Sequence, residues 1–155
     1  MSSVSGMIRT MAAVPYVHLA NPKKNAEEIS ALLDIADQNG AFLCVFPELS
    51  LTGMTCGDLF MQPALLSAAQ EALHALLEKD VKTVFVVGLP VQMGGRLYNC
   101  AAVIACGELT LVPMDTPGCA HWFAPAACAP DSVCLFGETI PVLQNPVFDC
   151  APLTI

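Results

Sequence analysis

The most informative stretch of this sequence runs from Val45 to Phe60, VFPELSLTGMTCGDLF. It begins inside the apolar run Phe42–Phe46, FLCVF, which is typical of a strand buried in a parallel sheet. Pro47 ends this run, and Glu48 follows directly. A carboxylate at the carboxyl end of such a strand lies where α/β sheets place their active sites. Glu48 is therefore a candidate general base, with a solvated loop residue as the alternative.

Two helical segments flank this stretch. Upstream, Asn21 is suited to cap a helix whose first position is Pro22. Apolar residues continue at helical spacing until Asn39-Gly40, which ends the helix. Downstream, Pro63 opens a second helix with one apolar face. The run Met7–Val14 predicts a strand before the first helix.

Three further strands follow the second helix. Val84–Leu89 is another buried apolar run, and Gly94-Gly95 predicts a hairpin turn into the strand Leu97–Cys106. A turn at Gly107-Glu108 leads into Leu109–Val112. The predicted order is β-α-β-α-β-β-β, an α/β fold with a mixed sheet.

The last third of the chain is less regular. Pro113–Pro130 predicts a long loop, because prolines and small residues interrupt any period. Val133–Phe136 and Thr139–Val142, separated by Gly137-Glu138, predict a short hairpin. Val147–Ile155 ends in strand-like residues without a cap or turn, so we expect the sequence to stop within an element.

Composition excludes several classes of function. The chain carries a net charge of −8 with only six lysines and arginines, so we expect no nucleic-acid partner. No apolar stretch is long enough to span a membrane, and no secretory signal is apparent, so we expect a cytoplasmic protein. Hydrophobic residues make up 55% of the chain and charged residues 13%. This apolar excess indicates a partner subunit or a missing part of the same protein.

Eight cysteines invite a disulfide, zinc or redox interpretation. No Cys-x-x-Cys pair occurs, and the chain lacks the features of a small secreted domain, so reduced and buried thiols are favoured. Cys44, Cys100 and Cys106 lie in predicted strands and are expected to be inert core residues. A thiol or redox protein has little beyond the cysteine count in its favour. We expect no metal site.

The residues around Glu48 carry a resemblance to a known family. Phe46–Leu49, Leu51–Gly53 and Cys56–Phe60 resemble the first motif of the nitrilase, or carbon–nitrogen hydrolase, superfamily. The version Thr-Cys-Gly-Asp-Leu-Phe is similar to the glutamine-amidase domain of glutamine-dependent NAD synthetases. Other stretches agree in family order: Asn21–Ile29, Gly88–Pro90, Leu97–Ala102, Val133–Pro141 and Phe148–Asp149.

The resemblance implies a fold and a division of the chain. It implies a nitrilase-like α-β-β-α sandwich with a mixed sheet, here incomplete. Residues 1–155 would form the N-terminal portion of the glutaminase domain, and the synthetase domain would be absent. No phosphate-binding loop is found, so we expect no cofactor in this chain and no direct ATP, NAD or magnesium ligand.

The family's chemistry uses three side chains. A cysteine attacks the glutamine amide, a glutamate moves the protons, and a lysine stabilises the oxyanion. The glutamate maps onto Glu48. The lysine position, after Val112-Pro113, holds Met114, which supplies no charge. A family tyrosine near the bound glutamine is replaced by Met54, and the nucleophile is expected beyond Ile155, so it is absent.

Other residues were weighed as replacements. Cys119, two residues before His121, and Cys56 are candidate nucleophiles, but neither has evident activation by a cation or a helix start. His18 is expected in a loop and His74 on a helix surface. Trp122 and Phe123 are expected to anchor the long loop to the sheet.

Two hypotheses remain from these observations. In the first, the chain is part of the glutamine amidohydrolase domain of an NAD synthetase, which supplies ammonia for amidating deamido-NAD, and is inactive by itself. In the second, it is a degenerate, non-catalytic nitrilase-like protein that serves in interactions or as a scaffold. The expected partners are glutamine in the intact domain, and either a second copy of the chain or the missing C-terminal part.

Overall fold

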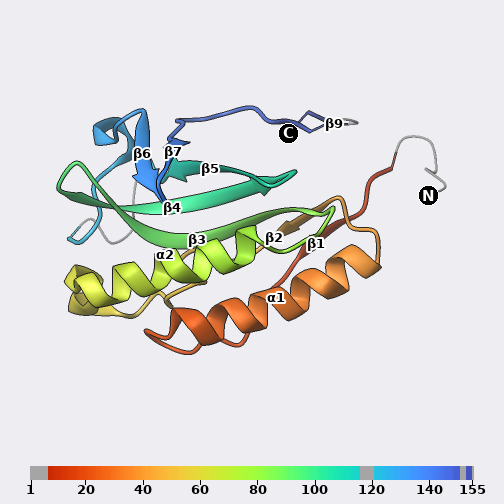
Figure 1. Cartoon of the computed structure of the whole chain (residues 1–155), viewed down its shortest axis with the longest axis horizontal. Coiled ribbons are helices and arrows are strands. Elements are labelled where there is room, and N and C mark those ends of the chain that lie inside the picture. Colours follow the sequence, from red (N-terminus) through yellow and green to blue (C-terminus); the bar gives the residue numbers. More distant parts are fainter. Residues whose placement is uncertain (1–6, 116–120, 151–152, 155) are drawn as a thin grey trace.

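The computed structural model describes residues 7–115, 121–150 and 153–154. A five-stranded sheet with the order β1-β2-β3-β4-β5 forms its centre (Figure 1). The first three strands are parallel and the last two antiparallel, so the predicted mixed sheet is confirmed. The strands are β1 (Thr10–Ala12), β2 (Leu43–Val45), β3 (Val84–Met93), β4 (Arg96–Ala105) and β5 (Glu108–Pro113).

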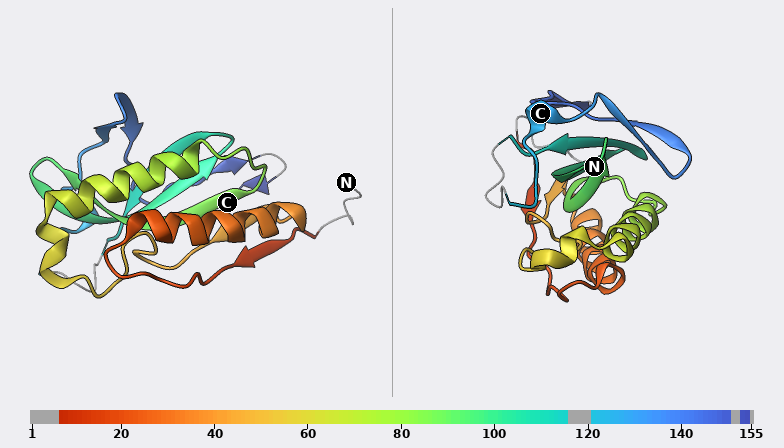
Figure 2. Two further views of the ribbon diagram at one scale, coloured as in Figure 1. Left: turned by 60° about the horizontal axis from the view of Figure 1, so that its bottom comes forward. Right: turned by 90° about the vertical axis from the view of Figure 1, so that its left-hand side faces the viewer.

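Two helices, α1 (Pro22–Gln38) and α2 (Pro63–Leu77), cover one face of the sheet (Figure 2). Both begin at the predicted prolines, and the side chain of Asn21 accepts a hydrogen bond from the backbone of Lys24, as expected of a cap. A short 3-10 helix, η1 (Gly57–Met61), lies between Glu48 and α2.

The hairpin turns refine the predicted strand ends. Gly94 and Gly95 both have positive φ, as the predicted two-residue turn requires. β3 continues past the predicted end at Leu89, and Pro90 lies opposite Asn99 of β4. Pro90 is tolerated because β2 pairs with β3 only as far as Val86, which leaves this side of β3 unpaired.

Two other turns lie one residue earlier than predicted. The positive φ values fall on Cys106 and Gly107, and again on Phe136 and Gly137. The strands that follow therefore begin at Glu108 and Glu138. The expectation that Cys106 is an inert core residue is wrong, because this turn leaves it exposed.

The opposite face of the sheet is covered only in part. The predicted hairpin forms from β6 (Ser132–Leu135) and β7 (Glu138–Pro141), followed by β8 (Asp149–Cys150) and β9 (Leu153–Thr154). The residues that follow β7 are joined to β5, because the backbone nitrogen of Leu143 donates to the carbonyl of Leu111 at 2.9 Å. Over β2 this face is open, and Val45 is 39% exposed, although its strand was expected to be buried.

Residues 121–128 pack on both η1 and the sheet, so the expected anchoring of Trp122 and Phe123 to the sheet is confirmed in part. Phe123 is buried, with its ring 5.0 Å from that of Phe60. The indole nitrogen of Trp122 donates to Asp58 at 3.2 Å. On the sheet side, the backbone nitrogen of Ala124 donates to the carbonyl of Leu97, the hydroxyl of Tyr98 donates to the carbonyl of Cys128, and the side chain of Leu97 joins the cluster around Phe123. This segment contains a second 3-10 helix, η2 (Ala126–Cys128).

Candidate functional site

Glu48 lies at the carboxyl end of β2, as predicted. The chain leaves the sheet after Phe46, whose backbone still donates to Val86 of β3 at 2.9 Å. Glu48 then begins a tight turn and is partly buried. Its Oε1 accepts a hydrogen bond from Nδ2 of Asn99, a buried residue of β4. The carboxylate is thus held by a neutral amide donor.

Gly88 of β3 permits the close approach of this turn to the sheet. A Cβ at Gly88 would lie 2.3 Å from the backbone nitrogen of Leu49 and 2.8 Å from the carbonyl oxygen of Pro47. The backbone nitrogen of Gly88 donates to the hydroxyl of Ser50 at 3.2 Å, and its carbonyl accepts from Leu51 at 3.0 Å. No side chain fits between the turn and the strand.

Asn25 of α1 fixes the far end of the turn. It is fully buried, and its Nδ2 donates to the carbonyls of His18 and Leu51, both at 2.9 Å. Its Oδ1 accepts from the backbone of His18 at 2.7 Å. The helix, the preceding loop and the turn are therefore joined by one side chain. His18 lies in a loop and His74 on the exposed face of α2, as predicted.

Sequence reasoning treated Gly88, Asn25 and Asn99 only as parts of motifs. Two signals pointed to a structural role. Asn25 precedes Ile29 by four residues, so a polar residue lies on the apolar face of α1. Gly88 interrupts a strand, which often marks a close approach of another backbone. No sequence signal paired Asn99 with Glu48, which are 51 residues apart.

A cavity of about 340 Å³ opens beside Glu48. Its walls are largely apolar and come from the ends of β2 and β5 and from the interior of β3 and β4, including Val45, Val86 and Val112. Glu48 and Met114 both line it. Nδ2 of Asn99 lies 3.8 Å from the sulfur of Met114, so one amide contacts both residues.

The structure brings together two of the three predicted positions. Met54 is 51% exposed and is not among the residues that line the cavity. Within the part of the chain that the structure describes, no lysine or arginine lines it either. The cavity therefore offers a carboxylate proton acceptor without a cation for a developing oxyanion.

The described thiols are not suited to attack a substrate here. Cys100 borders the same cavity, but it is 1% exposed, and burial raises its pKa to about 12. Burial also raises the pKa of Cys56, whose sulfur donates to the carbonyl of Thr52. Both remain protonated at neutral pH, and the thiolate is the nucleophile. Cys119 lies outside the described residues.

Two further features of the described residues bear on function. No group of three or more His, Cys, Asp or Glu side chains is placed to hold a metal ion. None of the helices has the length and apolar character needed to cross a membrane.

Comparison with known proteins identifies the family. The carbon–nitrogen hydrolase model matches residues 10–133. The glutamine-dependent NAD(+) synthetase of Mycobacterium tuberculosis is 36% identical over 111 residues, covering 70% of this chain and 16% of that protein. The chain thus spans about a sixth of the length of this relative.

Solved structures agree with the fold. The crystal structure of a glutamine-dependent NAD(+) synthetase from Cytophaga hutchinsonii superposes with a TM-score of 0.86 at 18% identity, covering 95% of this chain and 27% of that one. An amidase from Nesterenkonia sp. gives a TM-score of 0.65 at 20% identity, covering 88% of this chain and 54% of that one.

Proposed function

Because the chain belongs to the carbon–nitrogen hydrolase family, we propose that it carries the general-base part of a glutamine amidohydrolase site. Glu48 takes the base position, accepting a proton from an attacking thiol and passing it to the leaving ammonia. In the intact domain, the ammonia would serve the amidation of deamido-NAD. One feature supports the assignment: the carboxylate borders an apolar cavity, where Asn99 fixes its orientation.

The same proposal implies that this chain does not hydrolyse glutamine by itself. Met114 takes the lysine position and supplies no charge, so the oxyanion of a tetrahedral intermediate would lack its cation. Cys100, which borders the cavity, and Cys56, which lies in another cluster, are both buried, and burial raises the pKa of both thiols. A second copy would carry the same Met114, so the missing groups would have to come from a further part of the same protein. The open apolar sheet face at Val45 supports this requirement.

The setting and ligands follow from the same assignment. The six cysteines whose side chains the structure describes are unpaired, which fits a reducing compartment, and we place the chain in the cytoplasm. The chain corresponds to the N-terminal portion of the amidase domain. It binds no cofactor of its own.

The test is ammonia release from glutamine by the purified protein. No release above background is expected, because a base without an activated thiol and an oxyanion donor cannot complete acyl transfer. Two variants are measured in parallel. Glu48→Ala removes the proposed base, and Glu28→Ala is the control for the loss of a carboxylate elsewhere. Release that is abolished by Glu48→Ala and retained by Glu28→Ala would overturn the proposal, since the chain would then be a working amidase.

A non-catalytic interaction protein is the second candidate function. Met114 favours this function. It places an uncharged side chain, in contact with Asn99, where the family resemblance places the catalytic lysine. This function requires association with another polypeptide. Self-association is the simplest form, and we propose that the chain forms a homo-oligomer.

A further inference from the structure

The cavity beside Glu48 contains a carboxylate that no cation balances. Among the described residues that line it, Glu48 is the one carboxylate, and the rest are uncharged. All six lysines and arginines of the chain lie in the described ranges, and none of them borders this cavity: Arg9, Lys23, Lys24, Lys79, Lys82 and Arg96. A carboxylate in largely apolar surroundings is stabilised by a partner of opposite charge. The cavity therefore favours a cationic ligand.

The hydrogen-bonding groups around Glu48 have free capacity for such a ligand. An ionised carboxylate offers about four acceptor positions, and within the described part of the chain only Asn99 donates to it. Asn99 is 4% exposed, and both of its contacts use Nδ2. Its Oδ1 accepts no hydrogen bond from the described residues and belongs to the same planar amide, so it lies close to the carboxylate. An ammonium group has three donors and can bond to both residues.

Small apolar side chains of the sheet form the floor of the cavity. Gly88, Ala101 and Val112 lie opposite one another in the register of β3, β4 and β5, and Val45 lies opposite Val86 in the neighbouring row. The volume of about 340 Å³ is at the lower end of the range of about 300–1,000 Å³ for small-molecule sites. Such a floor offers contact to a short aliphatic body and no partner for a second charge.

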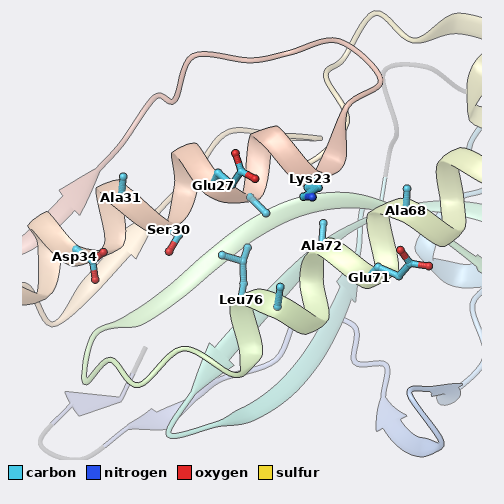
Figure 3. Close-up of a pocket in the computed structure, with 11 residues that line it drawn as sticks. Lys23, Glu27, Ser30, Ala31, Asp34, Ala68, Glu71, Ala72 and Leu76 are labelled. Atoms are coloured by element: carbon cyan, nitrogen blue, oxygen red, sulfur yellow. The ribbon is translucent and has the colours of Figure 1, made fainter.

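The larger groove between α1 and α2 differs from this cavity in its charges (Figure 3). Its three carboxylates, Glu27, Asp34 and Glu71, are exposed to solvent. Lys23 lines the same groove, and the ammonium of Lys79 already holds Asp34 at 2.7 Å. Exposed ion pairs contribute little free energy, because water and salt screen them. The groove should therefore bind a cation weakly, and it provides a control.

We propose that the cavity beside Glu48 binds a small aliphatic primary amine in its ammonium form. The ammonium lies between the carboxylate of Glu48 and Oδ1 of Asn99, and the aliphatic body lies on the floor of the sheet. An α-amino acid is disfavoured, because its own carboxylate would meet apolar walls and the like charge of Glu48. The proposal rests on the proposed function in taking this cavity as the functional site. Ammonia release and amine binding are measured separately, so either can fail without the other.

The test compares three probes that share one branched aliphatic body: isoamylamine, isoamyl alcohol and isovalerate. Each is titrated into the isotope-labelled full chain at neutral pH and followed by amide chemical shifts. Isoamylamine is expected to bind in the millimolar range or more tightly and to shift the amides of Ala101 and Val112. Isoamyl alcohol should bind about tenfold more weakly, since a hydroxyl makes no charge-assisted bond. Isovalerate should not bind, because Glu48 repels it.

Two variants of the cavity should lose the amine. Glu48→Gln removes the charge and keeps the shape, so it should weaken isoamylamine binding about tenfold or more. Met114→Lys places an ammonium in the cavity and should abolish binding of the amine. Glu71→Gln is the matched control, because it makes the same change in the groove of Figure 3, and it should bind isoamylamine like the wild type.

Circular dichroism should show that every variant retains its helices. Four results would each overturn the proposal: no binding of isoamylamine to the wild type, equal binding of the amine and the alcohol, unchanged amine binding by Glu48→Gln, or equal weakening by Glu71→Gln.

Discussion

Individual side chains limit what the cavity beside Glu48 can do. Glu48 supplies a carboxylate, and Asn99 supplies a neutral donor that reaches both Glu48 and Met114. Met114 supplies no charge where the family resemblance places a lysine. Cys100 contributes a sulfur, but its burial keeps it as a neutral thiol. The same burial that makes Cys100 inert gives it a measurable effect on stability at alkaline pH.

Cys100 should make the free energy of unfolding fall as the pH rises above 9. Its pKa is raised from 9.0 to about 12 in the folded chain, so the unfolded chain loses this proton first. Stability is therefore retained below pH 9 and lost between pH 9 and 12, by at most about 1.4 kcal/mol per pH unit. Urea unfolding of Cys100→Ala from pH 8 to 11 should show a shallower decline.

Cys106→Ala is the control for this measurement, since Cys106 lies exposed in the β4–β5 turn. It should decline with pH like the wild type. Equal slopes for the wild type and Cys100→Ala would contradict the assignment of Cys100 as a buried, protonated thiol.

At the scale of elements, contact between the Glu48 turn and β3 positions the site. The turn is not held by regular pairing, because β2 ends at Val45. It is held by hydrogen bonds to the two backbone groups of Gly88 and by the buried amide of Asn25. Removing the space at Gly88 would therefore move the Glu48 carboxylate without altering it.

Gly88→Ala should destabilise the chain by about 2–3 kcal/mol, because its Cβ would meet backbone atoms that cannot rotate away. Gly40→Ala provides the comparison. Gly40 has a φ of +66° with open space around it, so alanine there costs about 1 kcal/mol of conformational strain only. Urea denaturation measures both variants. A smaller loss for Gly88→Ala than for Gly40→Ala would contradict the close contact.

At the scale of the whole molecule, the described residues form two apolar clusters, and the smaller one joins distant parts of the chain. The larger lies around the central sheet, including the layer beneath α1 and α2. The smaller brings η1 and the start of α2 together with Leu97 of β4 and Phe123. Long-range packing at Phe123 therefore fixes the position of residues 121–128.

Phe123→Ala should cost about 3–5 kcal/mol, because it removes a buried ring from contact with Phe60. The release of the segment should also shift the fluorescence of Trp122, whose indole is otherwise bonded to Asp58. Thermal and urea unfolding followed by fluorescence measure both effects. His121→Ala, an exposed neighbour, should leave stability within about 0.5 kcal/mol of the wild type. Equal stability of the two variants would rule out this cluster as an anchor.

The amino-acid sequence alone determined the order of the elements, the starts of both helices and the place of Glu48. These depend on local chemistry: an asparagine cap, prolines at first helical positions, and apolar runs that end at turn residues. The hairpin at Gly94-Gly95 was equally predictable, because few other residues adopt its backbone angles. The exact turn residues elsewhere were not, since Cys106 and Phe136 take positive φ against their own preference.

Only the tertiary structure decided what surrounds Glu48. The register of β4 places Asn99 against the carboxylate, and the path of the turn presses Leu49 onto Gly88, contacts between residues about 40 or 50 positions apart. The exposure of Val45 likewise depends on what covers the sheet, and not on the strand itself. Local preferences specify each element, whereas register and layer packing depend on long-range contacts that a periodic pattern does not encode.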